Sequence, residues 1–418
     1  MYKIAVCGCG VVGSGVCDAL IYQKEKLSRR FAREVGLAYV LDIRDLTGTP
    51  YEPYKVDSLD TILADPEVEV VTITIGGLDL AADYCFRALE SGRHVVTSNK
   101  AVVAAHGPAL EKLAFSKGRR FMYEASVGGG IPIIRPLNIC LFANDITEIQ
   151  GILNGTTNYM LTGMYRRHAS FDEMLARAQK KGYAEADPTA DVDGYDAARK
   201  IAILSSIAYG AFVDYRDVPC MGIRKVALCD HELADKAGFT IKLIAGSRFE
   251  DGKVYISVEP KLVRRGHLLS DVNSVYNAIL TKGNYTGDSL FYGQGAGKEA
   301  TASAVVGDIV ELLGAPRTFS LPDFVDRKAV VANDDRPTRY YLRFTSFRQP
   351  SAGTLIDLFG EDTLCLYSKV ERDPWDEINP ESTAAVITPA YQPEELPEKL
   401  ESLAALGAKL KLTLKVLD

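Results

Sequence analysis

Short apolar stretches rich in valine and isoleucine recur along the first third of the chain, with helical stretches between them. The apolar stretches read KIAVCG, LAYVLDI, VEVVTITI, HVVTS and RRFMYE. Runs that are apolar on both faces are typical of strands inside a parallel sheet, and helices that alternate with such strands cover both faces of the sheet. The pattern therefore predicts an α/β domain with a doubly wound parallel sheet over residues 1–137.

The pattern changes after residue 144. A longer strand, ITEIQGILNG, is followed by TTNYMLTGMY and FDEMLARAQKKG, which have helical spacing. Residues 138–295 are therefore predicted to form a second, α+β domain, and a segment at about 296–325 is predicted to return to the first domain. Near the C-terminus, TRYYLRF, GTLIDLF, TLCLYSK, TAAVITP, EELPEKLESLAAL and KLKLTLKVL predict the order βαββαβ, a ferredoxin-like module over residues 338–418.

Composition narrows the class of protein. With 418 residues, 47% hydrophobic and 25% charged, the chain is long enough for two or three globular domains. A net charge of −7 without a basic cluster argues against a nucleic-acid partner. No apolar run approaches eighteen residues and the chain enters a strand at once, so neither a membrane span nor a signal peptide is expected. Eight cysteines without paired spacing predict free thiols in a reducing cytoplasm.

A glycine-rich turn follows the first predicted strand. In GCGVVG, the residues Gly8, Gly10, Val11, Val12 and Gly13 form G-x-G-x-x-G between a strand and a helix. The glycines permit a tight turn, let the backbone approach a pyrophosphate and allow the helix to pack closely on the strand. The turn predicts a Rossmann-type dinucleotide site, although a glycine-rich turn that binds nothing has the same pattern.

The second predicted strand ends near residues that distinguish NAD from NADP. Asp42 can accept hydrogen bonds from a ribose 2′-hydroxyl, which favours NAD, whereas Arg44 can pair with a 2′-phosphate, which favours NADP. Arg44 tips the prediction slightly toward NADP. The segment VVTSNKAVV leaves another strand through Ser98 and Lys100, at the sheet edge where ligands of doubly wound folds bind. These residues are expected to contact a nicotinamide, or else Ser98 simply caps a helix.

An acidic stretch, GYAEADPTADVDGYDAARK, packs five carboxylates in front of one lysine. Apolar residues fall three, four and seven places after Lys200, so a core-facing helix is predicted, with Asp193 as its N-cap. Asp196 lies four places before Lys200 on the same stripe. An aspartate that directs a partly buried ammonium suits a proton donor or acceptor. A solvated acidic loop and a structural ion pair remain alternatives.

Six motifs stand in one order along the chain: GCGVVGSGV, TSNK, EASVGGGIPII, GILNGTTNYML, KKGYAEADPTADVDGYDAARKIAIL and GQGAGKEATASAVVGDI. Together, from residue 3 to about residue 312, they resemble the homoserine dehydrogenase family. Members of that family interconvert aspartate semialdehyde and homoserine with NADPH or NADH, a step shared by threonine, methionine and isoleucine synthesis. The resemblance implies a small amino-acid substrate and a homodimer or higher homo-oligomer built through the sheet of the second domain.

The resemblance also assigns roles to individual residues. It makes Lys200 the proton donor to the developing alkoxide, with Asp196 orienting it. Lys100 falls between nicotinamide and substrate, where it can join in proton transfer. Glu185 and Asp191 match the residues that bind the substrate's ammonium group.

Further matched positions concern the cofactor and an ion. Gly182 and Gly297 fall where the family's backbone touches cofactor or substrate. The family's structural sodium ion is held largely through backbone oxygens, at positions that match Glu124, Val127, Gly129 and Ile131.

The C-terminal module resembles the ACT regulatory domain that many bacterial members of the family carry, where threonine is a feedback inhibitor. The usual D-x-P-G turn after its first strand is replaced here by RQPSAG, and the next helix is short. Threonine sensing and a purely dimer-stabilising role both remain open for this module.

Three other functions fit part of the pattern. A related oxidoreductase on another small aldehyde or amino acid would share the same motifs. A phosphorylating aldehyde dehydrogenase would need a cysteine beside an activating histidine, and the chain has none in a catalytic context. A non-catalytic nucleotide sensor would join a Rossmann domain to a regulatory module, but it would have no need for the proton donor Lys200.

Overall fold

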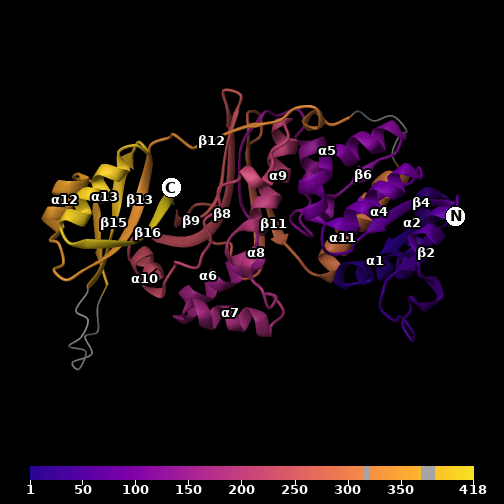
Figure 1. Ribbon diagram of the computed structural model, residues 1–418, viewed down its shortest axis with the longest axis horizontal. Coiled ribbons are helices and arrows are strands. Elements are labelled where there is room, and N and C mark those ends of the chain that lie inside the picture. The colour runs from indigo at the N-terminus through magenta and orange to yellow at the C-terminus, as the bar shows by residue number, and fades with distance from the viewer. Residues whose placement is uncertain (315–320, 369–381) are drawn as a thin grey trace.

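The protein is elongated, with three parts along its longest axis (Figure 1). The structure is a computed structural model that describes residues 1–314, 321–368 and 382–418. The N-terminal residues form one end, the C-terminal residues form the other, and a middle part lies between them. Within the described ranges, no helix has the length and apolar character needed to cross a membrane.

The N-terminal part is built on a six-stranded sheet in which all neighbouring strands are parallel. The strand order is β3-β2-β1-β4-β5-β6, so the chain starts in the middle and changes direction between β1 and β4. The strands are β1 (Tyr2–Cys7), β2 (Val35–Leu41), β3 (Lys55–Val56), β4 (Val68–Ile73), β5 (His94–Thr97) and β6 (Phe121–Met122). Each of the five predicted stretches overlaps one of these strands, and only the two-residue β3 was not predicted.

Helices cover this sheet, as the alternating pattern predicted. They are α1 (Val11–Tyr22), α2 (Lys24–Phe31), α3 (Leu59–Ala64), α4 (Asp79–Glu90), α5 (Lys100–Ser116) and α11 (Lys298–Gly314). Alternate residues of β1 separate into two cores, with Ala5 and Cys7 in one and Ile4 and Val6 in the other. The late helix α11 lies beside α1 (Figure 1). Helix α11 therefore packs against the N-terminal part, while residues 315–320 of the segment predicted to return to that part lie outside the described residues.

The middle part contains a mixed sheet with helices on one face. Its strands are β7 (Ile146–Ile152), β8 (Phe239–Glu250), β9 (Lys253–Arg264), β10 (Tyr276–Gly283), β11 (Gly287–Gln294) and the short β12 (Val330–Ala332). Its helices are α6 (Gly155–Arg167), α7 (Phe171–Lys180), α8 (Thr189–Val192), α9 (Tyr195–Tyr209) and α10 (Leu228–Lys236). Alternate apolar residues of β8, such as Ile241, Leu243 and Ala245, join the main core.

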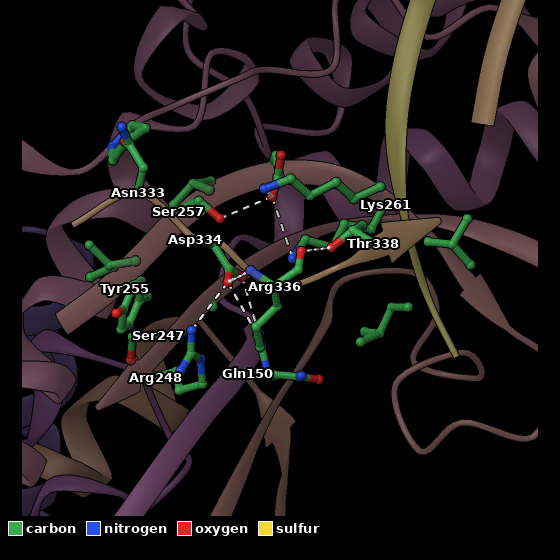
Figure 2. A pocket seen from close by; sticks show the side chains of 18 of the residues that line it. Gln150, Ser247, Arg248, Tyr255, Ser257, Lys261, Asn333, Asp334, Arg336 and Thr338 are labelled. Carbon is green, nitrogen blue, oxygen red and sulfur yellow. Dashed lines mark hydrogen bonds and ion pairs between the residues drawn. The ribbon is translucent and has the colours of Figure 1, made fainter. Parts of the chain in front are cut away.

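The opposite face of β7, β8 and β9 carries polar side chains and a pocket of about 640 Å³. Figure 2 shows Gln150, Arg248, Tyr255 and Ser257 pointing into this pocket, together with Arg336 from the segment after β12. Residues that point to this polar face alternate along each strand with residues that point into the core, which is the pattern typical of an antiparallel sheet.

The C-terminal part follows the predicted order βαββαβ. Its elements are β13 (Thr338–Ser346), α12 (Ala352–Phe359), β14 (Leu364–Tyr367), β15 (Ser382–Tyr391), α13 (Leu396–Ala405) and β16 (Ala408–Leu417). The strands are ordered β16-β13-β15-β14, and their apolar residues form a separate core with Leu355 and Phe359 of α12 and Leu403 of α13. Lys369, at the end of the predicted strand TLCLYSK, lies outside the described residues.

Strand β16 also joins this module to the middle part. It pairs in parallel with β9, so that Lys415 lies opposite Lys261 and Leu417 opposite Val263. The strands of both parts therefore form one continuous sheet. The buried Asp230 of α10 strengthens the junction through two side chains of β13. Its Oδ1 accepts a hydrogen bond from Tyr341 Oη at 2.7 Å and forms an ion pair with Arg343 Nε at 2.8 Å.

The prediction that Asp193 caps the helix that carries Lys200 is wrong. Helix α9 begins at Tyr195 and its N-cap is Gly194, whose φ of 90° lies in the left-handed region. Glycine adopts this conformation without steric cost, whereas an aspartate cap requires extended backbone. Asp193 instead pairs with Arg224, with 2.6 Å between Oδ1 and Nε.

Candidate active site

The glycine-rich turn between β1 and α1 has the shape that a dinucleotide site requires. Gly8 has a φ of 95°, which favours glycine. A Cβ on Gly13 would lie 1.7 Å from the carbonyl oxygen of Gly8, so only glycine lets α1 approach the turn. A Cβ on Gly10 would meet no atom within 4 Å, and this space in front of the α1 N-terminus can accept a pyrophosphate.

Asp42 and Arg44, the two residues predicted to choose between NAD and NADP, bind each other. Arg44 donates from Nε and Nη2 to the two Asp42 oxygens at 2.9 and 2.8 Å. Asp42 Oδ2 also accepts from the backbone N–H of Cys9 in the glycine-rich turn. The hydrogen bonds from Arg44 hold the pKa of Asp42 down at about 2. Asp42 is therefore engaged as an anion, while the half-exposed Arg44 borders the site.

The TSNK segment lies at the carboxyl end of β5. Asn99, not Ser98, caps helix α5, because its side chain accepts from the backbone N–H groups of Ala101 and Val102. Ser98 lies immediately before this cap and is half-buried. Lys100 is the first residue of α5 and points toward the middle part, where its Nζ lies 3.1 Å from Asp196 Oδ1.

Asp196 and two lysines form the centre of the site. Asp196 lies in the first turn of α9, and Lys200 follows one turn later, with its Nζ 2.7 Å from Asp196 Oδ2. Lys100 occupies the other carboxylate oxygen. The Lys200 side chain is 11% exposed and that of Lys100 is 41% exposed. One buried aspartate thus bridges a lysine from each of two separate helices, and the ammonium group of Lys100 is the more accessible one.

The electrostatics of Asp196 favour its ionised form. Burial would raise the pKa of this carboxyl, but the charges of Lys200 and Lys100 and the hydrogen bonds from Lys200 and Asn154 outweigh burial and hold the pKa well below its usual range. A permanent anion at this position keeps the two ammonium groups directed.

A turn at the end of β7 completes the cluster. The backbone oxygen of Leu153 accepts a hydrogen bond from Lys200 Nζ at 2.7 Å. Asn154 Nδ2 donates to Asp191 Oδ1 at 2.7 Å and to Asp196 Oδ2 at 2.9 Å. The sequence interpretation named neither Leu153 nor Asn154. An asparagine directly before a helical stretch indicates a helix cap, but nothing in that pattern shows that its amide reaches two distant carboxylates.

Glu185 and Gly182 stand apart from this cluster. Within the described residues, the exposed Glu185 carboxylate has no hydrogen-bond or ion-pair partner. Its backbone oxygen accepts from Gln179 Nε2 at 3.1 Å. Gly182 has a φ of 71° and lies in the same exposed loop. Of the predicted substrate residues, the structure therefore places Asp191 in the cluster and leaves Glu185 on a loop beside it in sequence.

The loop predicted to hold sodium is compatible with a cation bound by backbone oxygens. Among the described residues, the buried carbonyl oxygens of Val127, Gly129 and Ile131 accept no hydrogen bond. The Glu124 carboxylate accepts from three backbone N–H groups, those of residues 133–135, so its side chain is already used. Gly297 returns the chain to this region with a φ of 126°, just before α11.

These features define a class of protein. A six-stranded parallel sheet carries a dinucleotide turn at its switch point, and a cluster of two lysines and an aspartate is shared between this part (Lys100) and the middle part (Asp196 and Lys200). This is the arrangement of an NAD(P)-dependent oxidoreductase. The family model described as homoserine dehydrogenase, NAD binding domain, matches residues 8–124, and the model described as homoserine dehydrogenase matches residues 132–310.

Sequence relatives and solved structures similar to this chain are enzymes of this class. A homoserine dehydrogenase from Synechocystis sp. is 41% identical over 385 residues, which cover 88% of this chain and 89% of that protein. The crystal structure of a homoserine dehydrogenase from Thiobacillus denitrificans superposes with a TM-score of 0.88 at 31% identity, covering 100% of this chain and 98% of that one. A hyperthermophilic archaeal homoserine dehydrogenase in complex with NADPH has a TM-score of 0.63 at 27% identity and covers 75% of this chain and 98% of its own. The chain belongs to the homoserine dehydrogenase family.

Proposed function

We propose that this enzyme interconverts L-aspartate 4-semialdehyde and L-homoserine, with Lys200 as the proton donor and acceptor. The observation that supports these roles is the bridge in which Asp196 holds both Lys100 and Lys200 at 3.1 and 2.7 Å. Reduction of an aldehyde leaves negative charge on its oxygen, and ammonium groups near that oxygen stabilise the charge before one of them donates a proton. The nicotinamide supplies or accepts the hydride when it is bound.

The carboxylates nearby are proposed to bind the amino end of the substrate. Asp191 uses Oδ1 to accept from Asn154, and within the described part of the chain Oδ2 has no partner. Burial raises the pKa of Asp191, and the charge of Asp196 adds to this effect. A substrate ammonium at Oδ2 would relieve the cost of the buried charge. Glu185 would reach the same ammonium from the exposed loop.

The cofactor residues proposed from the turn are Gly8, Gly10, Val11, Val12 and Gly13. Arg44 favours NADP because it borders the site, is half-exposed and is always charged. Ser98, Gly182 and Gly297 are proposed to line the nicotinamide end. A sodium ion is proposed to bind at the carbonyl oxygens of Val127, Gly129 and Ile131, and at Glu124. This site is supported by the three carbonyl oxygens, which accept no hydrogen bond among the described residues.

Larger-scale features extend the proposal. We propose a division into residues 1–137, 138–295 and 338–418, the last of these being an ACT-like module. A homodimer would form through the polar face of the mixed sheet, which the helices leave uncovered. Eight unpaired cysteines support a reducing location such as the cytoplasm. The proposed reaction would then be a step shared by threonine, methionine and isoleucine synthesis, as in the family.

Nucleotide absorbance with L-homoserine tests the proposed function. The wild-type protein is expected to reduce NADP or NAD, and Lys200→Ala is expected to lower kcat by about 100-fold or more while nucleotide affinity stays unchanged, because general acid and base catalysis contributes about 10² to 10⁴. Lys180→Ala, at an exposed position at the end of α7, is the matched control and should retain full activity. A wild-type protein that binds nucleotide but reduces none of it would contradict the substrate assignment. A fully active Lys200→Ala variant would contradict the role of Lys200.

A further inference from the structure

Asn154 occupies a position from which it contacts both functional carboxylates. It lies two residues after the end of β7, is 5% exposed, and caps α6 by accepting from the backbone N–H of Thr157 at 2.8 Å. The cap fixes the orientation of the amide group, because the oxygen must face the Thr157 N–H and the nitrogen must face the other way. The nitrogen therefore points toward acceptors only, and both acceptors are carboxylate oxygens.

The two N–H bonds of this nitrogen serve two different acids. One goes to Asp191 Oδ1 at 2.7 Å and the other to Asp196 Oδ2 at 2.9 Å, so both donors are used. Asp196 has two lysines as further partners, whereas Asn154 is the sole hydrogen-bond donor to the Asp191 carboxylate among the described residues. The direction of the Asp191 carboxylate therefore depends on Asn154.

We propose that Asn154 is a positioning residue that sets the distance between the carboxylate that binds the substrate's amine and the carboxylate that directs the proton donor. This inference rests on the proposed function. The substrate is short, so the spacing between its ammonium group and its reacting carbon is limited. A site that holds the two acids at one spacing selects substrates whose amine and carbonyl are separated to match, and it aligns the carbonyl oxygen with Lys200.

The backbone next to Asn154 supports this role. Leu153 accepts from Lys200 Nζ at 2.7 Å, so residues 153 and 154 contact the proton donor, its orienting acid and the second acid. β7 lies between β10 and β8 in the middle of the mixed sheet, and hydrogen bonds on both sides hold it. The turn is therefore anchored in a rigid element, whereas Asp191 lies on the four-residue helix α8.

The charged groups that face the two acids determine the pH response of a variant. They are Lys100 from α5, Lys200 from α9, and each acid toward the other. Removal of the Asn154 donor takes a hydrogen bond from both carboxylates and raises the pKa of each. Because kcat/KM reports groups of the free enzyme, its acid limb is expected to move to higher pH.

The test uses Asn154→Ser in the full-length protein. Serine is a good N-cap, so α6 keeps its cap, but the shorter side chain cannot reach the two acids. The expected result is a rise in KM for L-homoserine of about 10- to 100-fold, a smaller fall in kcat, and an acid limb of kcat/KM shifted upward by about one pH unit, with unchanged nucleotide affinity. Ser170→Ala, which removes the cap of α7 away from the site, controls for helix capping and should leave all of these values as in wild type.

The outcomes separate this inference from the proposed function. Wild-type kinetics and an unmoved acid limb in Asn154→Ser would overturn the positioning role, as would an equal loss of activity at every pH without a change in KM. If the serine variant does not fold, the isosteric Asn154→Asp, which also caps helices, is measured in the same way and is expected to show the larger shift because it adds a third carboxylate. A wild-type protein without activity on homoserine would instead overturn the proposed function.

Discussion

The environment of single side chains decides their charge in this protein. Asp196 and Asp191 lie close together and accept from the same asparagine nitrogen, yet their pKa values move in opposite directions. Two lysines outweigh burial for Asp196, whereas burial dominates for Asp191. Similar side chains in one site thus acquire different chemistry from the number of donors that each one meets.

Buried His231 provides a residue-scale prediction about pH. It is 2% exposed, and burial together with the charge of Lys242 lowers its pKa to about 4. Between pH 6.5 and 4 the unfolded chain binds a proton that the folded protein does not, so stability falls as pH falls through this window. His231→Phe removes this contribution. The wild type is expected to lose about 2 kcal/mol relative to the variant between pH 6.5 and pH 5, measured by urea unfolding at each pH. Identical pH slopes in both proteins would contradict the assignment.

At the scale of elements, the contact between β1 and α1 depends on Gly13. Gly13→Ala would place a Cβ 1.7 Å from the Gly8 oxygen, so α1 must move away from the turn. Overpacking of this kind costs about 1 to 3 kcal/mol, and nucleotide affinity should fall with it. Gly10→Ala is the matched comparison, since its Cβ enters open space. That variant should keep wild-type stability and lose nucleotide affinity alone, as measured by thermal unfolding and nucleotide titration. Equal stability of the two variants would contradict the packing role of Gly13.

Much of the N-terminal sheet could be predicted because its signals are local. Apolar runs such as VEVVTITI have few alternatives to a buried strand. The spacing of glycines at positions 8, 10 and 13 is typical of a dinucleotide-binding turn. The alignment of Asp196 with Lys200 was also predictable from a local signal, because residues four places apart lie on one face of a helix. The N-cap of that helix was predicted wrongly because Asp193 and Gly194 both suit a helix start, and the pairing with Arg224 that decides between them involves a residue far along the chain.

Features that depend on distant residues were not predictable. Asn154 looks like an ordinary cap until Asp191 and Asp196 fold back onto it, and Asp42 and Arg44 were interpreted as alternatives although they bind each other. The pattern of the C-terminal module predicted its element order. Nothing in that pattern indicated that β16 would pair with β9.

At the scale of the whole molecule, the junction between the middle part and the C-terminal module rests on a buried ion pair. Asp230 is fully buried, and burial raises its pKa while Arg343 opposes that shift. Arg343→Met leaves the carboxylate without its cation and is expected to lower the free energy of unfolding by about 3 to 5 kcal/mol. Arg339→Met is the control on the same strand, because Arg339 pairs with the more exposed Asp418 and its loss should cost about 1 kcal/mol or less. Denaturant unfolding of both variants measures the difference, and equal costs would contradict the importance of the buried pair.

The parallel pairing of β9 with β16 affects how the chain is made. Translation proceeds at about 5 to 20 residues per second, so Lys261 is synthesised on the order of ten seconds before its neighbour Lys415. During that interval the end of β9 has free backbone donors and acceptors, and such an edge can pair with a strand of another chain. Two nascent chains on one messenger RNA would carry this edge at the same time. The continuous sheet that joins the parts of the finished enzyme therefore makes its synthesis sensitive to how closely ribosomes follow one another.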